Sequence, residues 1–511
     1  MNLIKSLSKL KSQLVGDTEK NDNYFISKVA SATGWPRTEA KEKMDIAKKQ
    51  LGVPYETYYE KKYYKRTRPQ QERLANKYLR EQAKVKRILE RISKKTGQTP
   101  EEIQSRINKL NVLDFYPVDI SIYNKYSMYE MDDEAIIMLL QALSKVDVLT
   151  NSLENKLKEI DEGRLSYADI TEELLSYQGL LKQTLTKGLR KKLTRKIRSL
   201  YPALCKDEVR REELLVDIEL ARNLLHFTIN EYKMYRLFDT DFKGKRDYLN
   251  DYDRSQIIRH LNTKKILDLL NNKYALYQKI CPFFKRDVAS ILSENDFKAF
   301  VAFTAEHPSF VCKPINDAMG RGITLEHIDS EKDISEQFHA LLKDRKTFLM
   351  EEQISASPKL SVFNPDSLNT VRLIVYYDGE NVIPVGSFFR TGRPGSFVDN
   401  AGAGGVFASV DYKTGILNSH GADEKGRFYE EHPDSHIRYE GFQIPNWNDA
   451  LNVSRDATIA MGMPCFIGWD LALDENDEWV IVEGNGFPQF VHQAPLEHGV
   501  KPQFIKDMGL A

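Results

Sequence analysis

The chain has 511 residues, a length that predicts about two to four domains. Its 74 lysine and arginine residues are balanced by 74 aspartate and glutamate residues, so no net charge draws nucleic acid or an anionic membrane to the whole surface. No run approaches the ~20 apolar residues of a membrane span, and no secretory leader pattern is present, so we expect a globular protein of the cytoplasm. The four cysteines lie too far apart for a metal motif or a disulfide framework.

Two charged segments in the first half could have partners. Residues 2–14 place leucine and isoleucine on one helical face beside lysines, a pattern typical of a helix on a membrane surface, although an ordinary capping helix fits equally well. Residues 187–198 hold seven lysine and arginine residues, enough to bind phosphate or a lipid headgroup. A solvated helix face is the alternative for this segment, and without an aromatic RNA-binding signature we expect no nucleic-acid partner. Peripheral contact with the inner face of the membrane stays open for both segments.

Residues 1–255 are predicted to be almost entirely helical, because apolar residues recur every three or four positions, as in Ile136, Leu139, Leu140, Leu143 and Val146. A weak internal repeat is present. Residues 26–34, a helix and a tyrosine cluster at 55–59 are echoed about 63 residues later by residues 92–97, a helix and two further tyrosines. Two imperfect copies fit duplicated helical hairpins that only pack together, or stacked units with a binding surface. A third tyrosine-rich stretch, at 232–248, does not align with them.

The composition changes near residue 260, since 19 of the 27 glycines follow residue 319. Runs of β-branched and aromatic residues at 370–377, 382–389 and 406–410 are separated by turn dipeptides and predict antiparallel hairpins. Helical patterns at 264–279, 331–344 and 449–461 interrupt them. We therefore predict an α+β domain at 256–511 after an all-α domain at 1–255.

A short apolar strand ends at Lys313 and is followed by Gly320 and Gly322. The strand fixes the lysine, and glycines let backbone N–H groups approach phosphate oxygens closely. This is not a Walker A loop, because the lysine precedes the glycines. Alone, the pattern fits a plain tight turn as well as a phosphate site.

Three oxygen ligands are predicted to converge on a hairpin near the C-terminus. Strands at 466–473 and 479–485 are joined by an acidic turn, and Glu483 and Asn485, two residues apart, project from one face. The hairpin brings Asp470 alongside them, which makes Asp470, Glu483 and Asn485 a candidate Mg²⁺ site. A solvated hairpin with an acidic turn is the alternative, but it leaves the apolar-flanked Asp470 and Glu483 without partners.

The order of these motifs resembles the ATP-grasp superfamily, and in detail its sugar-transfer-associated branch, over residues 260–500. The motifs that carry the resemblance are Val311-Cys312-Lys313-Pro314, the hinge 348–354, Gly468-Trp469-Asp470 and Val482-Glu483-Gly484-Asn485. The family fold clamps ATP between two α+β subdomains, here expected at 256–345 and 346–511.

The resemblance implies roles for individual residues. Lys273 and Lys313 would hold α- and β-phosphate oxygens, and Gly320 and Gly322 would close over the β- and γ-phosphates. In the hinge, Met350, Glu351, Glu352 and Ile354 would line the adenine and ribose, with Glu351 or Glu352 accepting the ribose hydroxyls. Arg372 and Arg390 would stabilise the transferred phosphoryl group. Asn400, Gly404 and Gly405, with Gly402, would form a loop for the acceptor.

One position departs from related peptide-forming ligases, which have an arginine two residues before the first metal carboxylate. That position here is Gly468, so Arg372 or Arg390 would have to substitute.

The resemblance implies an ATP- and Mg²⁺-dependent ligase that joins a carboxylate to an amine through an acyl phosphate, with a cell-envelope glycan, a sugar nucleotide or its precursor as one substrate. The helical half would recognise that acceptor or a partner. The alternatives are a kinase that phosphorylates a sugar hydroxyl and an ATP-binding scaffold in polysaccharide assembly.

Overall fold

The computed structural model describes residues 18–315, 322–395 and 404–509. The predicted helix at residues 2–14 lies outside this part of the chain. Two compact units are present, one of Met1–Ser144 with Thr186–Leu189 and one of Lys145–Leu185 with Arg190–Ala511. The predicted domain limit at residue 255 rests on composition and stays a prediction.

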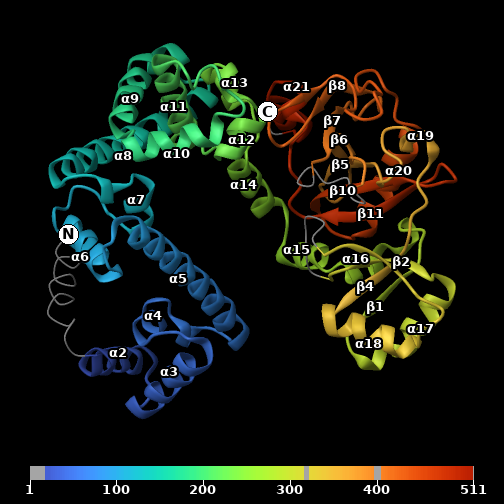
Figure 1. The fold of residues 1–511 in the computed structure, drawn as a ribbon, viewed down its shortest axis with the longest axis horizontal. Helices are drawn as coiled ribbons and strands as arrows, with labels where there is room; N and C mark the ends of the chain where they lie inside the picture. Colours follow the sequence, from blue (N-terminus) through green and yellow to red (C-terminus); the bar gives the residue numbers. More distant parts are fainter. Residues whose placement is uncertain (1–17, 316–321, 396–403, 510–511) are drawn as a thin grey trace. The chain divides into compact units, whose positions relative to one another are not determined.

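The described chain is helical up to the end of α14, as the sequence predicted (Figure 1). The helices are α2 (Thr18–Thr33), α3 (Arg37–Leu51), α4 (Tyr55–Glu60), α5 (Arg68–Thr96), α6 (Pro100–Val112), α7 (Ile120–Lys125), α8 (Asp133–Asp161), α9 (Thr171–Thr184), α10 (Lys187–Ile197), α11 (Glu208–Asn223), α12 (Ile229–Met234), α13 (Phe242–Arg246) and α14 (Asp251–Leu261). Their ends follow sequence signals. A capping box of Thr67 and Gln70 begins α5, and Gly97, at φ 77°, ends it.

Two of these helices bear on the expected membrane contacts. By length and hydropathy α8 is the one described helix that could span a membrane, but core helices pass the same test. Its predicted apolar face is buried, with Ile136 and Leu140 inaccessible to solvent. In the basic helix α10, Arg190 is engaged by Glu212 through two hydrogen bonds of 2.7 and 3.0 Å. Membrane contact through residues 187–198 stays a prediction.

The internal repeat has three copies in the structure. In each copy a six-residue helix (α4, α7 or α12) is followed by a residue in the left-handed region and a three-residue 3-10 helix. The left-handed residues are Lys62, Ser127 and Arg236. Four positions before them stand Tyr58, Tyr123 and Tyr232, all buried. The stretch at 232–248, which did not align with the other two in sequence, therefore contains a third copy, recognised by Tyr232 and Arg236.

The first sheet has four strands in the order β1-β4-β2-β3, all antiparallel. The strands are β1 (Val288–Ile291), β2 (Ser309–Lys313), β3 (Thr324–His327) and β4 (Phe348–Glu352). The helices α17 (Phe297–Glu306) and α18 (Ile334–Arg345) lie beside it (Figure 1). Phe300, Phe310 and Phe338 form the centre of the core between them.

The second sheet has seven antiparallel strands in the order β11-β10-β5-β6-β7-β8-β9. The strands are β5 (Thr370–Tyr377), β6 (Val382–Thr391), β7 (Val406–Val410), β8 (Leu417–Ala422), β9 (Phe428–Tyr429), β10 (Cys465–Leu473) and β11 (Trp479–Asn485). The predicted hairpins β5–β6 and β10–β11 are confirmed. The remaining helices of this half are α15 (Lys264–Asn271), α16 (Lys273–Ile280), α19 (Pro358–Ser361), α20 (Trp447–Ala460), α21 (Gln493–Leu496) and α22 (Lys501–Asp507).

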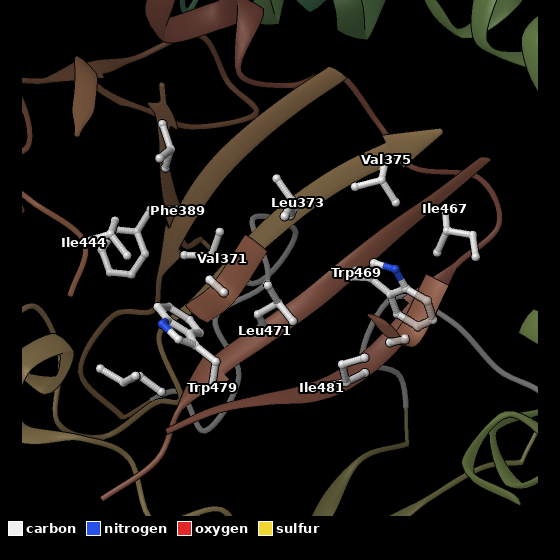
Figure 2. Packing of buried hydrophobic residues seen from close by; sticks show 14 of the residues in the cluster. Val371, Leu373, Val375, Phe389, Ile444, Ile467, Trp469, Leu471, Trp479 and Ile481 are labelled. Carbon is white, nitrogen blue, oxygen red and sulfur yellow. The ribbon is translucent and has the colours of Figure 1, made fainter. Parts of the chain in front are cut away.

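The two faces of the seven-stranded sheet differ. One face is apolar and packs against a core that includes residues of α15, α16 and α20 (Figure 2). Val371 and Leu373 of β5 and Trp469 and Leu471 of β10 point to this face. Because side chains alternate along a strand, Arg372 and Asp470 project from the opposite face. The candidate site is on that face.

Candidate active site

Three charged side chains meet at the edge of the small sheet. Lys313, at the end of β2, places Nζ 2.7 Å from Oε2 of Glu351 on β4. Arg286 donates to the same oxygen from Nη2 at 2.8 Å. All three residues are buried. Burial alone would raise the pKa of Glu351, but Lys313 and Arg286 outweigh it and lower that pKa to about 2, so the carboxylate stays ionised.

Arg286 also connects this cluster to the large sheet. Its Nη1 donates to the backbone oxygen of Ile481 at 2.6 Å, and its Nη2 to that of Val482 at 3.1 Å. Both acceptors lie on β11, directly before Glu483. Sequence reasoning missed Arg286, because it stands outside every motif and its partners lie 65 and about 195 residues further along the chain.

The predicted carboxylate cluster forms on the large sheet. Asp470 on β10 lies opposite Arg372 of β5 on one side and opposite Glu483 of β11 on the other. Arg372 donates two hydrogen bonds to Asp470, one from Nε to Oδ1 and one of 2.7 Å from Nη2 to Oδ2. Arg390 reaches the same oxygen from β6 at 2.9 Å and also donates to Thr370. Asp470, Glu483, Asn485 and the two arginines are thus brought together by strand register.

The two carboxylates have opposite electrostatic settings. Burial would raise the pKa of Asp470, but Arg372 and Arg390 outweigh it and lower that pKa to about 2. For Glu483, burial and then the charge of Asp470 raise the pKa, and Arg372, Lys313 and Lys273 only partly oppose them. A metal cation bound beside Glu483 would favour its ionised form and so oppose the rise in its pKa.

Asn485 completes the cluster. Its side-chain N–H donates to Oδ2 of Asp470 at 3.4 Å and to Oε1 of Glu483 at 3.3 Å. The amide therefore stands where the two carboxylates converge. Two carboxylates, with the Glu483 charge undercompensated, match the oxygen donors that Mg²⁺ takes beside nucleotide phosphates, and Asn485 would supply a third by turning its amide oxygen toward them. The residues present fit a magnesium site.

Neighbouring side chains leave no room for a side chain at position 468, which explains the glycine there. A Cβ atom there would lie 2.6 Å from Cβ of Pro488 and 2.9 Å from Cδ of Arg372. The stem of Arg372 and the ring of Pro488 thus occupy the space of a side chain at 468. Arg372 is therefore the arginine beside Asp470, reached from the neighbouring strand and not from two residues upstream.

Comparison with known proteins identifies the architecture. A family model described as sugar-transfer associated ATP-grasp matches residues 252–507, half of the chain. The chain belongs to the sugar-transfer associated ATP-grasp family. No curated protein matches the sequence significantly.

Solved structures that match the ATP-grasp chain are distant from it. VanG D-Ala:D-Ser ligase from Enterococcus faecalis has 13% identity and a TM-score of 0.32, over 47% of this chain and 62% of its own. N5-carboxyaminoimidazole synthase from Aspergillus clavatus has 12% identity and a TM-score of 0.29, over 50% of this chain and 58% of its own. D-alanyl-alanine synthetase A from Vibrio cholerae has 12% and 0.30, over 47% and 65%. Each match spans less than two thirds of the other chain.

Lys273, which the resemblance assigned to the phosphates, lies next to the small sheet. Lys273 is the first residue of α16, and its backbone N–H donates to the oxygen of Ile315 at 3.2 Å. Ile315 follows Lys313 by two residues. Lys273 and Lys313 both act on the pKa of Glu483, so the two lysines and the carboxylate cluster share one site.

The hinge residues divide between the two faces of β4. Glu351 points toward Lys313, whereas Met350 packs into the core of the small sheet. Glu352 points away from Glu351 and accepts the backbone N–H of Asp287 at 3.1 Å. Half-buried Ile354 follows β4, ahead of an isolated bridge between Ala356 and Asp474 that lies outside the named strands. Their contacts with adenine and ribose stay predictions.

The two glycine loops are described only in part. Gly320, Asn400 and Gly402 lie outside the described residues. Gly322 has φ 71°, and Gly404 has φ 96°, conformations that favour glycine. Gly405 is buried at the start of β7. Their roles toward phosphate and acceptor stay predictions.

Proposed function

We propose that this protein is an ATP- and Mg²⁺-dependent carboxylate–amine ligase. ATP phosphorylates a carboxylate, and an amine then displaces phosphate to give an amide. The observation that carries the proposal is the cluster of buried Asp470 with half-buried Glu483 and Asn485, flanked by Arg372 and Arg390 on the sheet and by Lys313, whose charge acts on Glu483. Cations and carboxylates in this arrangement are what phosphoryl transfer from a metal nucleotide requires.

Asp470, Glu483 and Asn485 would hold Mg²⁺, which neutralises phosphate charge and orients the γ-phosphoryl group. Lys313 and Lys273 supply point charges for the α- and β-phosphates. Lys313 pairs with Glu351, and a bound phosphate would be a further anionic partner for the same ammonium group. Asp470 fixes both arginines in place before the reaction begins.

The arginines have the central part in the chemistry. Arg372 and Arg390 are held rigidly on neighbouring strands, and charge grows on the transferred group and on the carbonyl oxygen in front of them. No side-chain nucleophile is required, because the γ-phosphate is attacked by the substrate carboxylate and the acyl phosphate by the amine. We infer that a cell-envelope glycan, sugar nucleotide or its precursor supplies one substrate, at a cytoplasmic site.

A hydroxylamine trap tests the reaction class. A ligase passes through an acyl phosphate, and hydroxylamine converts this intermediate into a stable hydroxamate. Incubation of the full chain with ATP, Mg²⁺, hydroxylamine and a panel of sugar acids should therefore yield a hydroxamate with one of them. The control is Asp470→Asn, which should yield none.

ATP consumption with accumulation of a stable phosphate ester, and no hydroxamate, would identify a kinase. Nucleotide binding without turnover on any substrate would favour the scaffold. In that case the pairing of two arginines with Asp470 would have no role in phosphoryl transfer.

A further inference from the structure

A cavity of about 450 Å³ lies within the second unit, away from the strands that carry the arginines. One wall is the third repeat copy with the start of α14, and the other is the β8–β9 turn with residues 489–491 after β11. Gly404, at the described end of the predicted acceptor loop, also lines it. The size is within the range of small-molecule sites, about 300–1000 Å³.

The walls of this cavity are held together by close contacts. Gly426 of the β8–β9 turn, at φ 77°, lies so near the third repeat that a Cβ atom would come within 2.4 Å of the oxygen of Lys233. On the other side, Arg254 of α14 donates to the oxygen of Phe487 at 3.1 Å. Glu231 accepts the backbone N–H groups of Thr228 and Asp251 at 2.8 and 2.6 Å. These contacts make the cavity a built feature.

The cavity wall is close in sequence to the candidate metal ligands. Phe487, which Arg254 contacts, is two residues after Asn485, and Gln489, which lines the cavity, is four residues after it. Pro488 between them packs on Gly468. The chain thus passes directly from the candidate metal ligands into the cavity wall.

Four cations and four carboxylates line the cavity, and two cation–carboxylate pairs bind each other. Asp251 is paired with Arg254 at 2.8 Å, and Asp423 with Arg427 at 2.7 Å. Within the described residues, the ammonium groups of Lys233 and Lys425 have no ion-pair or hydrogen-bond partner. Two carboxylates of the lining have no cation partner among the described residues: Glu231 accepts backbone N–H groups, and Glu424 has its pKa raised by burial and then by Asp423.

The other free groups donate or accept hydrogen bonds. Asn230 and Gln489 are exposed and offer amides, while Tyr235 and Phe490 line the cavity but are themselves buried. A lining of amides, charges and two rings suits a ligand with many hydroxyl groups better than an apolar one.

Comparison of the three repeat copies singles out Lys233. The position three residues before the left-handed residue holds Tyr59 in the first copy, Asn124 in the second and Lys233 in the third. The buried tyrosine beside this position is the same in all three. The lysine is therefore no requirement of the repeat fold, and it stands in the copy that borders the cavity.

We propose that this cavity binds the acceptor of the reaction, a sugar bearing a phosphate or carboxylate group, with Lys233 and Lys425 on its anionic group. The assignment of this sugar as the acceptor rests on the proposed function. The binding itself does not, and the helical half then contributes directly to the substrate site.

Binding to the full chain without ATP tests this proposal. The probes are glucose 6-phosphate and glucuronate, with glucose as the uncharged control, measured by isothermal titration and saturation-transfer NMR. The variants are Lys233→Met and Lys425→Met, singly and together, and the matched control is Lys243→Met, an exposed lysine of α13 outside the cavity lining.

We expect at least one charged probe to bind saturably and more tightly than glucose, with at least tenfold weaker binding to the double variant and unchanged binding to Lys243→Met. The stronger probe tells whether phosphate or carboxylate is the group recognised. Absence of binding by both charged probes, equal binding of glucose, or unchanged affinity in the double variant would overturn the proposal.

A fluorescent ATP analogue provides the second measurement. Its affinity should be the same in parent and double variant, since neither lysine belongs to the nucleotide site. A parallel loss of nucleotide affinity would attribute the effect to misfolding of the site and contradict a separate acceptor cavity. Sugar binding in a protein that forms no hydroxamate would refute the ligase chemistry and leave the cavity assignment intact.

Discussion

Asp470 and Glu483 are opposite each other on adjacent strands, yet their charges are not equally supported. Two arginines contact Asp470, whereas Glu483 has the amide of Asn485 and more distant lysines. Asp470 is thus an organiser of Arg372 and Arg390 as well as a candidate ligand. Glu483 is the residue whose charge most needs a bound cation.

Replacement of Glu483 by Gln should keep the shape of the site and lower the rate of ATP turnover by roughly 100-fold or more, because a charged ligand of the proposed Mg²⁺, and with it the electrostatic stabilisation of the reacting phosphate, is lost. Lys313→Ala should weaken nucleotide binding as well. Phosphate release gives the rate, and Glu475→Gln, in the exposed turn after β10, is the matched control. Turnover at the parent rate in Glu483→Gln would disprove the metal assignment.

Gly468→Ala should damage the site through sterics alone. The new methyl group would lie 2.6 Å from Pro488 and 2.9 Å from Arg372, so one of the two must move. We expect a loss of about 1–3 kcal/mol in the free energy of unfolding, together with reduced turnover. Gly179→Ala, on a helix with no atoms within 4 Å of the added group, should be neutral or slightly stabilising in the same urea titration.

His492 should make the protein sensitive to mild acid. It is buried beside Phe388 and Phe490, and burial lowers its pKa to about 3. The unfolded chain takes up a proton below about pH 6.5 while the folded chain does not, so stability falls as the pH drops from about 6.5 toward 3, by about 1.4 kcal/mol per unit.

His492→Phe should therefore lose less melting temperature between pH 7 and pH 5 than the parent does. The exposed His339→Gln should keep the parent's slope. An identical pH dependence in all three proteins would show that His492 does not cause the acid sensitivity.

At the scale of secondary structure, strands were predicted best where turns bound them. The runs at 370–377 and 406–410 have the bounds of β5 and β7. The predicted single helix at 264–279 is two helices, because Asn272 leaves the helical conformation and accepts the N–H of Ala275 as an N-cap. Glu483 and Asn485 were found because a period of two places them on one face.

What sequence patterns could not provide were contacts between distant segments. Arg286 binds Glu351 and two carbonyls of β11, and nothing in its neighbourhood marks it as buried. Glu351 and Glu352 look alike in sequence, but only the strand orientation sends one to Lys313 and the other to the far face. The third repeat copy was not recognised in the sequence. It shares the buried tyrosine, Tyr232, with the other two copies, but it does not follow them at the same distance along the chain.

Arg286→Met should unfold the connection between the two sheets, because it leaves the oxygens of Ile481 and Val482 unpaired and Glu351 with one cation. Removing one partner of a buried pair typically costs about 3–5 kcal/mol. Lys285→Met, which breaks the more exposed pair with Glu478, should cost less than about 1 kcal/mol. Equal midpoints for the two variants in urea would contradict the role given to Arg286.

At the scale of the whole molecule, the helical segment directly before residue 256 is built into the ATP-grasp half. Gln493 is fully buried and exchanges two hydrogen bonds, of 2.8 and 2.9 Å, with the backbone of Leu249. Lys501 donates its N–H to the oxygen of Asp247 at 2.8 Å. A cut at the composition boundary would leave these groups unpaired.

A fragment of residues 145–511 should consequently unfold cooperatively and bind ATP, whereas a fragment of 256–511 should melt at a lower temperature or aggregate. Calorimetry and nucleotide titration of the two fragments check this. A 256–511 fragment as stable as the longer one would show instead that the domain limit follows the composition.

The alternation of β5 and β10 separates two kinds of selection on one strand. Val371 and Leu373 pack into the core, whereas Thr370 and Arg372, at the alternate positions, contact Arg390 and Asp470 of the candidate site. Substitutions in one set leave the other set in place, whereas inserting a single residue exchanges them. Substitutions at the site-facing positions of these strands can therefore change substrate preference while the core-facing positions keep the sheet intact. This holds only as long as no residue is inserted into or deleted from the strand.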